Sequence, residues 1–221
     1  MMKLAAVKDK IPSKLFDILD KEIEEFRPAQ EKAIDQGLLR GKSLLVCTPT
    51  ASGKTLIAEL AAVKNIIDKG GKCVYIVPLK ALASEKFKDF KRKYDGLIRI
   101  ALSIGNLDSA DPYLAEYDLL IVTAEKMDSL LRHHAPWIKD VSVLVVDEVH
   151  LLNDIGRGPT LEILITLMKR LIKDIQVIAL SATIGNPDEL AEWLEAELVI
   201  DTWRPVKLHK GVFFDKEIEF Y

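Results

Sequence analysis

Six short runs of apolar, often β-branched residues alternate with amphipathic helical stretches, and this alternation restricts the folds open to the chain. We predict strands at 43–48, 73–78, 98–104, 119–123, 143–148 and 176–183. Helices are expected at about 54–69, 79–93, 124–134, 160–173 and 187–195. Uninterrupted apolar runs are typical of parallel strands that helices cover on both faces. The sequence therefore predicts a three-layer α/β fold with a mostly parallel central sheet.

The ends of the chain differ from this pattern. A length of 221 residues is typical of one large domain. We expect a helical lead-in at 1–24, the α/β domain at 25–202, and at 203–221 the start of a connection towards an absent second domain. Because a lone hairpin has little to pack against, the strand-like pattern at the C-terminus favours a fragment of a longer protein.

One helix carries recognisable signals at its start. Asn186 is expected to cap the helix at 187–195, Pro187 suits its first position, and Glu189 would complete a capping box.

Composition indicates the class of protein but not its partner. Hydrophobic residues make up 49% and charged residues 29%, a balance typical of soluble proteins with a sizeable core. The N-terminus lacks the apolar run of a secretory signal. Cys47 and Cys73 lack metal-ligand spacing, so we expect reduced core thiols in a cytoplasmic protein without a membrane partner. A net charge of −3 neither indicates nor excludes nucleic acid.

A phosphate-binding loop is predicted between the first strand and the helix at 54–69. The segment TPTASGKT at 48–55 matches the pattern G-x-x-x-x-G-K-[ST] from Gly53 onward, with Thr48 in place of the first glycine. Lys54 would neutralise the β and γ phosphates, and Thr55 would ligate Mg²⁺. The alternative is an ordinary βα loop with a solvated lysine. The ATP contacts expected from the loop are Thr48, Pro49, Thr50, Ala51, Ser52, Gly53, Lys54 and Thr55.

Two adjacent carboxylates end the strand at 143–148. A buried carboxylate without a partner is costly, so it needs a metal or another cation. If the loop holds a magnesium nucleotide, Asp147 at a neighbouring strand end would contact Mg²⁺ through water. Glu148 would then orient or deprotonate the attacking water. The alternative is a strand end followed by a helix cap, and His150 taken alone is better explained as a structural histidine.

Asp-Glu-Val-His at 147–150, behind a phosphate loop, resembles the acidic motif of superfamily 2 helicases of the Asp-Glu-x-His type. Over about residues 25–213, the chain is most similar to the superkiller-like branch of these helicases. Within that branch it resembles the archaeal DNA repair helicases that are associated with Holliday-junction migration and stalled replication forks. The resemblance implies a RecA-like first motor domain that uses ATP and Mg²⁺. It also implies adenine recognition by Gln30 and Arg27 in FRPAQEKAI. His150 would join Ser181 and Thr183 of LSAT in linking the ATP state to the grip on nucleic acid.

The same resemblance implies contacts with a nucleic-acid backbone. Three segments carry them: YIVPLKALASEKF at 75–87, LSIGNLDS at 102–109 and IVTAEKM at 121–127. Thr123 is in addition a natural N-cap for the helix that follows. The expected contact residues are Pro78, Lys80, Gly105, Thr123 and Lys126.

The parent protein is therefore expected to be a monomeric ATP-dependent DNA helicase of the 3′–5′ type, nucleoid-associated and active in DNA repair, recombination or at stalled forks. Its partners would be single-stranded or forked DNA and the missing C-terminal domains. The alternatives are an RNA helicase of the same branch, a phosphate-loop NTPase that does not translocate, and a non-catalytic binding module. The basic helix at 85–93 favours the binding module, but its interleaved acids favour a solvated face. Without the arginine pair of a second domain, the isolated chain should be nearly inactive.

Overall fold

A seven-stranded, entirely parallel sheet forms the centre of the protein in a computed structural model that describes residues 1–105, 110–206, 209, 211–214 and 217–220. The strand order is β3-β4-β2-β5-β6-β1-β7. The strands are β1 Leu44–Cys47, β2 Lys72–Val77, β3 Ile100–Ser103, β4 Leu119–Thr123, β5 Val141–Val146, β6 Gln176–Ser181 and β7 Glu197–Ile200.

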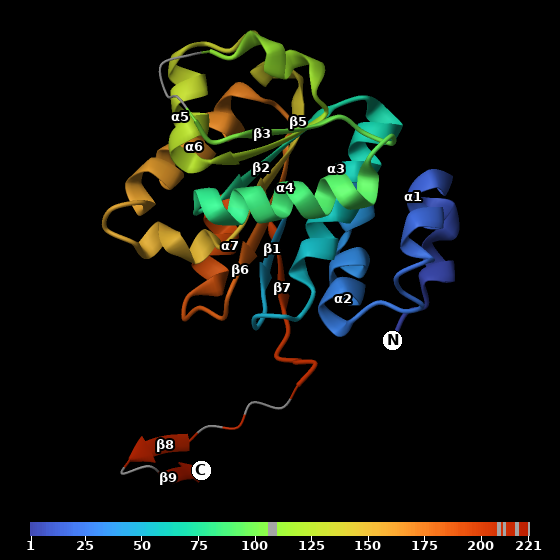
Figure 1. The fold of residues 1–221 in the computed structure, drawn as a ribbon, viewed down its shortest axis with the longest axis vertical. Helices are drawn as coiled ribbons and strands as arrows, with labels where there is room; N and C mark the ends of the chain where they lie inside the picture. The colour runs from blue at the N-terminus through green and yellow to red at the C-terminus, as the bar shows by residue number, and fades with distance from the viewer. Residues whose placement is uncertain (106–109, 207–208, 210, 215–216, 221) are drawn as a thin grey trace.

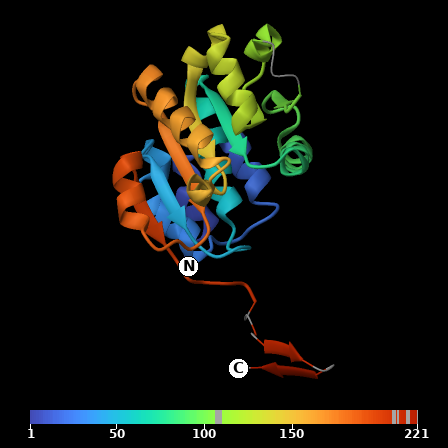
Figure 2. The same cartoon turned by 90° about the vertical axis from the view of Figure 1, so that its left-hand side faces the viewer.

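Helices cover both faces of this sheet (Figures 1 and 2). Short 3₁₀ helices lie between several of the main elements. The α-helices are α1 Ser13–Leu19, α2 Pro28–Gln36, α3 Lys54–Lys69, α4 Lys80–Tyr94, α5 Ala124–Arg132, α6 Gly158–Leu171 and α7 Pro187–Leu194. The predicted three-layer α/β fold is therefore confirmed.

The alternation of side chains along each strand divides the core into two layers. In β1, Leu44 and Val46 belong to the layer under α1 to α4, while Leu45 and Cys47 belong to the layer under α5 to α7. The central strands are buried on both faces, as expected from their continuous apolar runs. Burial raises the pKa of both free thiols, Cys47 and Cys73, which keeps them protonated.

The N-terminal segment contributes to the same core. Leu4, Val7, Leu15 and Leu19 are fully or almost fully buried among residues of α3 and of the sheet. Lys3 pairs with Glu25 in an antiparallel bridge, which brings the start of the chain beside the entry to α2. The division into a lead-in and a separate domain remains a prediction, although the packing is continuous across it.

At the other end of the chain, β8 Gly211–Phe214 and β9 Glu217–Phe220 form an antiparallel hairpin. Its strand residues are exposed, and Figures 1 and 2 place it away from the main body. Within the described part of the chain, no helix has the length and apolar character needed to cross a bilayer.

The structure differs from the sequence analysis at two places. Strand β7 was not predicted, because four residues directly after α7 give too short a pattern. Asn186 precedes α7 without capping it: its Nδ2 donates to Glu189 Oε2 at 3.1 Å, and the side chain makes no bond to the helix backbone. Pro187 does occupy the first turn, as predicted.

We predict that Leu15→Ala lowers the free energy of unfolding by about 2–5 kcal/mol, the usual cost of a large-to-small change in a core. Lys14→Ala, in the same helix but exposed, is the matched control and should change it by less than about 0.5 kcal/mol. Urea denaturation measures both variants. Equal midpoints for the two would show that the N-terminal segment does not stabilise the core.

Candidate functional site

The predicted site residues converge at the carboxyl ends of three adjacent strands. Thr48 follows β1, Ser181 ends β6 and Asp147 follows β5. Open α/β sheets bind their ligands at this edge. The sequence prediction placed Asp147 at a strand end next to β1, whereas the structure inserts β6 between β1 and β5. Ser181 therefore lies between the phosphate loop and the acidic pair.

The backbone of the loop explains which glycine is required. Gly53 has φ +92°, and a Cβ there would lie 2.5 Å from Gln30 Nε2, so both conformation and space demand glycine. Ala51 has the other left-handed conformation in the loop, with φ 66°. Thr48, where the common pattern has glycine, has no positive φ. Its hydroxyl bonds to the Ser52 hydroxyl at 2.7 Å and closes the base of the loop.

Gln30 and Arg27 hold the loop from the start of α2. Gln30 Nε2 donates to the Gly53 carbonyl at 2.9 Å, and Gln30 Oε1 accepts from the Arg27 backbone N–H at 2.8 Å. Arg27 Nη1 donates to the Ala51 carbonyl at 2.8 Å. One amide hydrogen and one lone pair of Gln30 remain for a ligand. The predicted adenine contact is thus compatible with a second function, which is to fix the shape of the loop.

Lys54 bridges the ends of β1 and β6. Its Nζ donates to the Thr48 carbonyl at 3.0 Å and to the Ser181 carbonyl at 2.8 Å. Burial lowers the pKa of this ammonium group, although the nearby carboxylates of Glu148 and Asp147 act in the opposite direction. Neutral carbonyls are weaker partners for an ammonium group than charged phosphates, so Lys54 can exchange them for the phosphates of a nucleotide.

Asp147 is a nearly buried carboxylate, with 8% of its surface exposed. Tyr75 of β2 donates its hydroxyl to Asp147 Oδ2 at 3.1 Å, and the Glu148 backbone N–H donates to Oδ1 at 3.1 Å. Burial, followed by the charge of Asp147, raises the pKa of Tyr75, so the phenol remains a donor. These bonds fix the orientation of the carboxylate.

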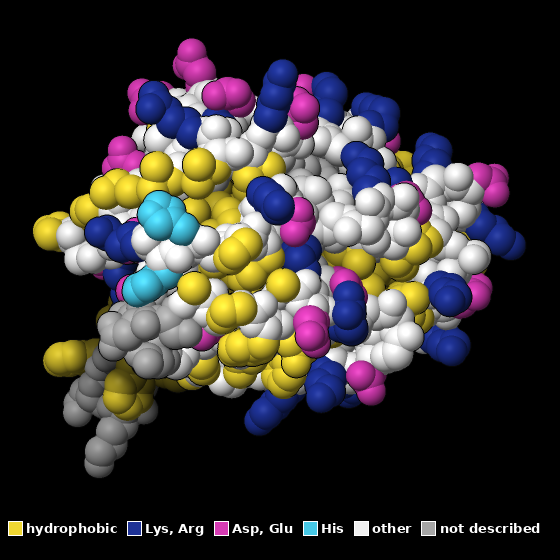
Figure 3. Space-filling model, turned by 90° about the horizontal axis from the view of Figure 1, so that it is seen from above, with side chains coloured by type: hydrophobic (Ala, Val, Ile, Leu, Met, Phe, Trp, Pro, Cys, Tyr) yellow, Lys and Arg dark blue, Asp and Glu magenta, His cyan; other side chains and the backbone are white. Residues whose placement is uncertain are grey.

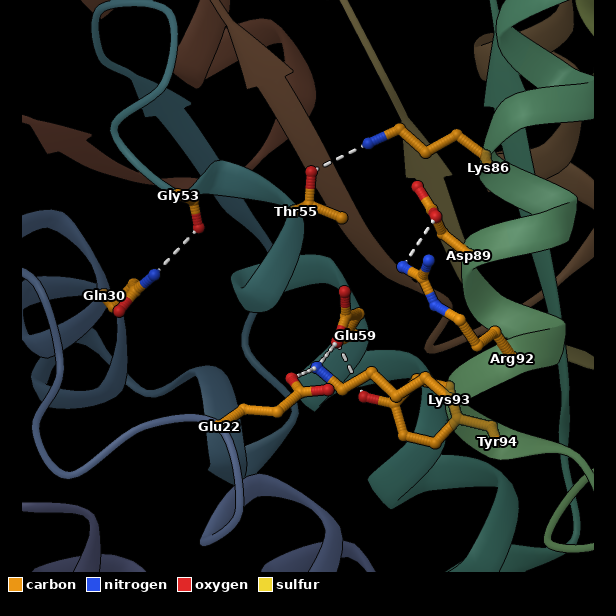
Figure 4. A network of polar contacts seen from close by, with 10 residues as sticks. All are labelled: Glu22, Gln30, Gly53, Thr55, Glu59, Lys86, Asp89, Arg92, Lys93 and Tyr94. Atoms are coloured by element: carbon orange, nitrogen blue, oxygen red, sulfur yellow. Dashed lines mark hydrogen bonds and ion pairs between the residues drawn. The ribbon is translucent and has the colours of Figure 1, made fainter.

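The cation facing this carboxylate is Lys86 of α4, which the sequence analysis did not identify. Its Nζ donates to Thr55 Oγ1 at 2.7 Å and lies 3.8 Å from Asp147 Oδ2 (Figure 4 shows the bond to Thr55). Lys86 precedes the buried Phe90 and Tyr94 by four and eight residues, so helical spacing places it on the inward face. That spacing was the available signal.

The predicted magnesium ligands pass a test of fit. Thr55 and Asp147 converge on one positive charge, the ammonium of Lys86, so both oxygens are directed at a position that accepts a cation. Among the described residues, no group of three His, Cys, Asp or Glu side chains could enclose a metal. Mg²⁺ usually takes one or two carboxylates and completes its shell with phosphates and water. The two side chains fit that mode of binding.

Glu148 has an unusual backbone. Its φ is +54°, in the left-handed region that non-glycine residues rarely adopt. The side chain is about one-third exposed, and Glu148 Oε2 lies 3.3 Å from His150 Nδ1. This backbone conformation directs the Glu148 side chain differently from the side chains of the extended residues that precede it.

His150 lies between Glu148 and the end of β6. Its Nδ1 accepts from the Ala182 backbone N–H at 3.5 Å and lies near Glu148 Oε2. Nδ1 accepts only when the ring hydrogen is on Nε2, whereas it donates in the other neutral tautomer and in the protonated ring, so the two contacts belong to different tautomers or protonation states. Ala182 separates the buried Ser181 from the exposed Thr183. The structure therefore brings the Asp-Glu-Val-His and Ser-Ala-Thr segments into contact.

Three of the predicted nucleic-acid contacts are accessible. Lys80 and Gly105 are exposed and Pro78 is half-buried. A Cβ on Gly105 would meet no atom of the described residues within 4 Å, so packing against the described part of the chain does not explain this glycine. The remainder of its loop, 106–109, lies outside the described residues. On the face seen in Figure 3, basic and acidic side chains drawn in colour are interspersed, so this face is not a uniformly basic surface.

Thr123 and Lys126, both predicted to contact nucleic acid, have structural roles within the domain. Thr123 Oγ1 accepts from the Lys126 backbone N–H at 3.4 Å, which confirms the predicted N-cap. The side chain of Lys126 is only 2% exposed, and its Nζ pairs with Asp111 Oδ2 at 2.7 Å. A lysine buried in this way cannot reach a DNA phosphate in this conformation. We therefore omit Lys126 from the proposed DNA contacts.

A second ionic cluster fixes α4 to α3 below the site (Figure 4). Lys93 pairs with Glu59 at 2.8 Å and with Glu22, and Tyr94 donates to Glu59 at 2.6 Å. Although burial opposes it, the two carboxylates raise the pKa of Lys93. The basic segment at 85–93 is therefore not simply a solvated face, because its first and last lysines point inward.

Comparisons with known proteins identify the family of the chain. The DEAD/DEAH box helicase family model matches residues 27–190. ATP-dependent DNA helicase Hel308 of Methanocaldococcus jannaschii is 56% identical over 94% of this chain and 18% of its own length. Hel308 of Pyrococcus abyssi is 54% identical over 92% of this chain and 28% of its own length. The chain thus spans less than a third of these relatives.

Solved structures show the same architecture. The crystal structure of the DUF1998 helicase MrfA has a TM-score of 0.75 and 29% identity, covering 86% of this chain and 33% of that chain. The crystal structure of MrfA bound to DNA has the same TM-score with 27% identity, covering 88% of this chain and 30% of that chain. The sheet order, the loop and acidic pair at one edge of it, and these matches agree, and the chain belongs to the DEAD/DEAH box helicase family as a RecA-like motor domain.

Proposed function

We propose that the chain is the first motor domain of an ATP-dependent DNA helicase that acts in DNA repair, recombination or at stalled forks. The observation that carries the proposal is the convergence of Lys54 and Thr55, at the start of α3, with Asp147, which follows β5, at the carboxyl edge of the sheet. A phosphate-loop kinase shares these three residues but has no use for Glu148 or for the contact between His150 and Ala182.

Each side chain has a task in nucleotide hydrolysis. Lys54 leaves the carbonyls of Thr48 and Ser181 and neutralises phosphate charge, while Thr55 and Asp147 would hold Mg²⁺, Asp147 through water. Mg²⁺ held there would supply charge neutralisation to the phosphates. Glu148 accepts a proton from the attacking water or orients it, a contribution typically worth about 10²–10⁴ in rate. Arg27 and Gln30 keep the loop in its binding shape and face the adenine.

Coupling to nucleic acid would pass through His150. A change at Glu148 during hydrolysis alters the charge beside the imidazole, and the same ring contacts the backbone of the Ser181-Ala182-Thr183 segment. We propose that this segment transmits the nucleotide state to the grip on DNA.

DNA is the proposed track because the similar curated proteins are named as DNA helicases. Pro78, Lys80 and Gly105 would contact the backbone, with Thr123 supporting the position of α5. Backbone contacts carry no base code, so binding should be weakly sequence-dependent and sensitive to salt. We further propose a monomeric enzyme that moves in the 3′–5′ direction and requires the remainder of the protein for unwinding.

We predict that the complete protein unwinds a DNA fork with a single-stranded tail faster than an RNA fork of matched sequence. The measurement is strand separation with ATP and Mg²⁺, and omission of ATP is the control. Faster separation of the RNA fork would favour an RNA helicase of the same branch. Brisk ATP hydrolysis without separation of either fork would favour an NTPase that does not translocate.

Two substitutions in the complete protein test the assigned roles. Lys54→Ala should abolish ATP turnover because the phosphates lose their main counter-charge. Glu148→Gln should retain ATP binding while turnover falls by about 10²–10⁴. The control is Lys69→Ala, because Lys69 is exposed at the far end of α3, the helix that begins at Lys54. This variant should have the same ATP turnover as the wild type. Normal turnover in Glu148→Gln would exclude Glu148 as the residue that activates water.

The 221-residue chain by itself should bind nucleotide weakly and hydrolyse it far more slowly than the complete protein. An arginine supplied to the γ-phosphate from elsewhere accelerates such reactions by about 10³–10⁵, and we assign that arginine to the missing second domain. Single-turnover ATP hydrolysis by both proteins, with and without single-stranded DNA, measures the ratio. A DNA-stimulated rate from the short chain equal to that of the complete protein would contradict this assignment.

A further inference from the structure

The ammonium group of Lys86 lies between two oxygens that the proposed function assigns to magnesium. It donates a hydrogen bond to Thr55 Oγ1 at 2.7 Å, and it lies 3.8 Å from Asp147 Oδ2. The two charged side chains are largely shielded, with 16% of Lys86 and 9% of Asp147 exposed. Lys86 also lies 5.9 Å from the centre of the Tyr75 ring, whose hydroxyl bonds to the same carboxylate.

This geometry is not that of an ordinary salt bridge. A charge-assisted N–H···O bond is about 2.7–2.9 Å long, so the ammonium of Lys86 is too far from Asp147 to be optimally paired. Its short contact is with the neutral hydroxyl of Thr55. The ammonium is therefore bonded to Thr55 and lies within ionic range of Asp147, so one positive charge is close to both oxygens that a metal ion here would use.

We propose that Lys86 substitutes for magnesium in the nucleotide-free domain and that the metal must displace it. The inference rests on the proposed nucleotide site and assigns it a residue that competes with the metal. A divalent ion beside Thr55 and Asp147 would repel an ammonium group held within a few ångströms of it. Lys86 thus keeps the buried carboxylate compensated when the site is empty and lowers the apparent affinity for the metal.

Helix α4 can tolerate the loss of this contact. Its C-terminal half remains attached through the pair of Lys93 and Glu59, through the bond from Tyr94 to Glu59, and through the buried ring of Phe90. Lys86 lies more than a turn before these anchors. Displacement of Lys86 therefore leaves the helix docked, and a neutral residue at this position should permit folding.

The test is a titration of Mn²⁺, as a paramagnetic probe for magnesium, into the complete protein saturated with ADP. Free Mn²⁺ is followed by electron paramagnetic resonance. Lys86→Met should raise the apparent affinity for Mn²⁺ by about tenfold, which corresponds to about 1.4 kcal/mol. Lys86→Gln provides a second neutral variant with the same expected gain. Lys88→Met, which removes an exposed lysine from the same helix, should match the wild type.

The outcomes separate the inference from the proposed function. Unchanged or weakened Mn²⁺ affinity in both Lys86 variants, with a wild type that binds Mn²⁺ and ADP together, overturns only the competing role of Lys86. A purely structural lysine could not produce the expected gain in affinity. If the wild type binds ADP without any dependence on Mn²⁺, or does not bind ADP, then the proposed nucleotide site itself is wrong.

Discussion

The candidate site of this domain is organised around one buried negative charge. Asp147 ends an apolar strand in a place where water reaches little of its surface, and an isolated carboxylate there would be very costly. The surrounding residues provide compensation from three elements: a phenol from β2, a backbone N–H from the next residue and an ammonium group from α4. Three-layer packing brings these groups together, and their convergence creates a position that accepts a cation.

The phosphate loop depends on contacts from outside its own segment. Lys54 is bound by carbonyls at the ends of two strands, and the Gly53 and Ala51 carbonyls are bound by Gln30 and Arg27 at the start of α2. Gln30, which we propose to contact adenine, is thus also a support for the loop that we propose to bind phosphate. Binding at the adenine side should therefore change the conformation of the phosphate loop, and the reverse, because Gln30 and Arg27 make hydrogen bonds to the loop.

Much of the fold could be predicted from the sequence because buried parallel strands produce continuous apolar runs. The same reasoning missed β7, whose four residues are too few for a pattern. It located the loop and the acidic pair, since strand ends in such sheets lie at one edge. It could not establish that β6 separates them, because strand order depends on contacts between distant segments. Lys86 and Lys126 could not be placed from residue type, because lysine is usually a surface residue. Only helical register or tertiary packing reveals that both side chains point inward.

The left-handed backbone of Glu148 has a consequence for the stability of the domain. A non-glycine residue in that region carries strain of about 1–3 kcal/mol, and here the strained residue is the one to which we assign the activation of water. Glycine at this position would relax the chain and favour a sturdier domain, yet it would remove the carboxylate. A substitution that relieves this strain would therefore stabilise the domain and remove the carboxylate in the same step, so stability and the proposed chemistry are opposed at this one position.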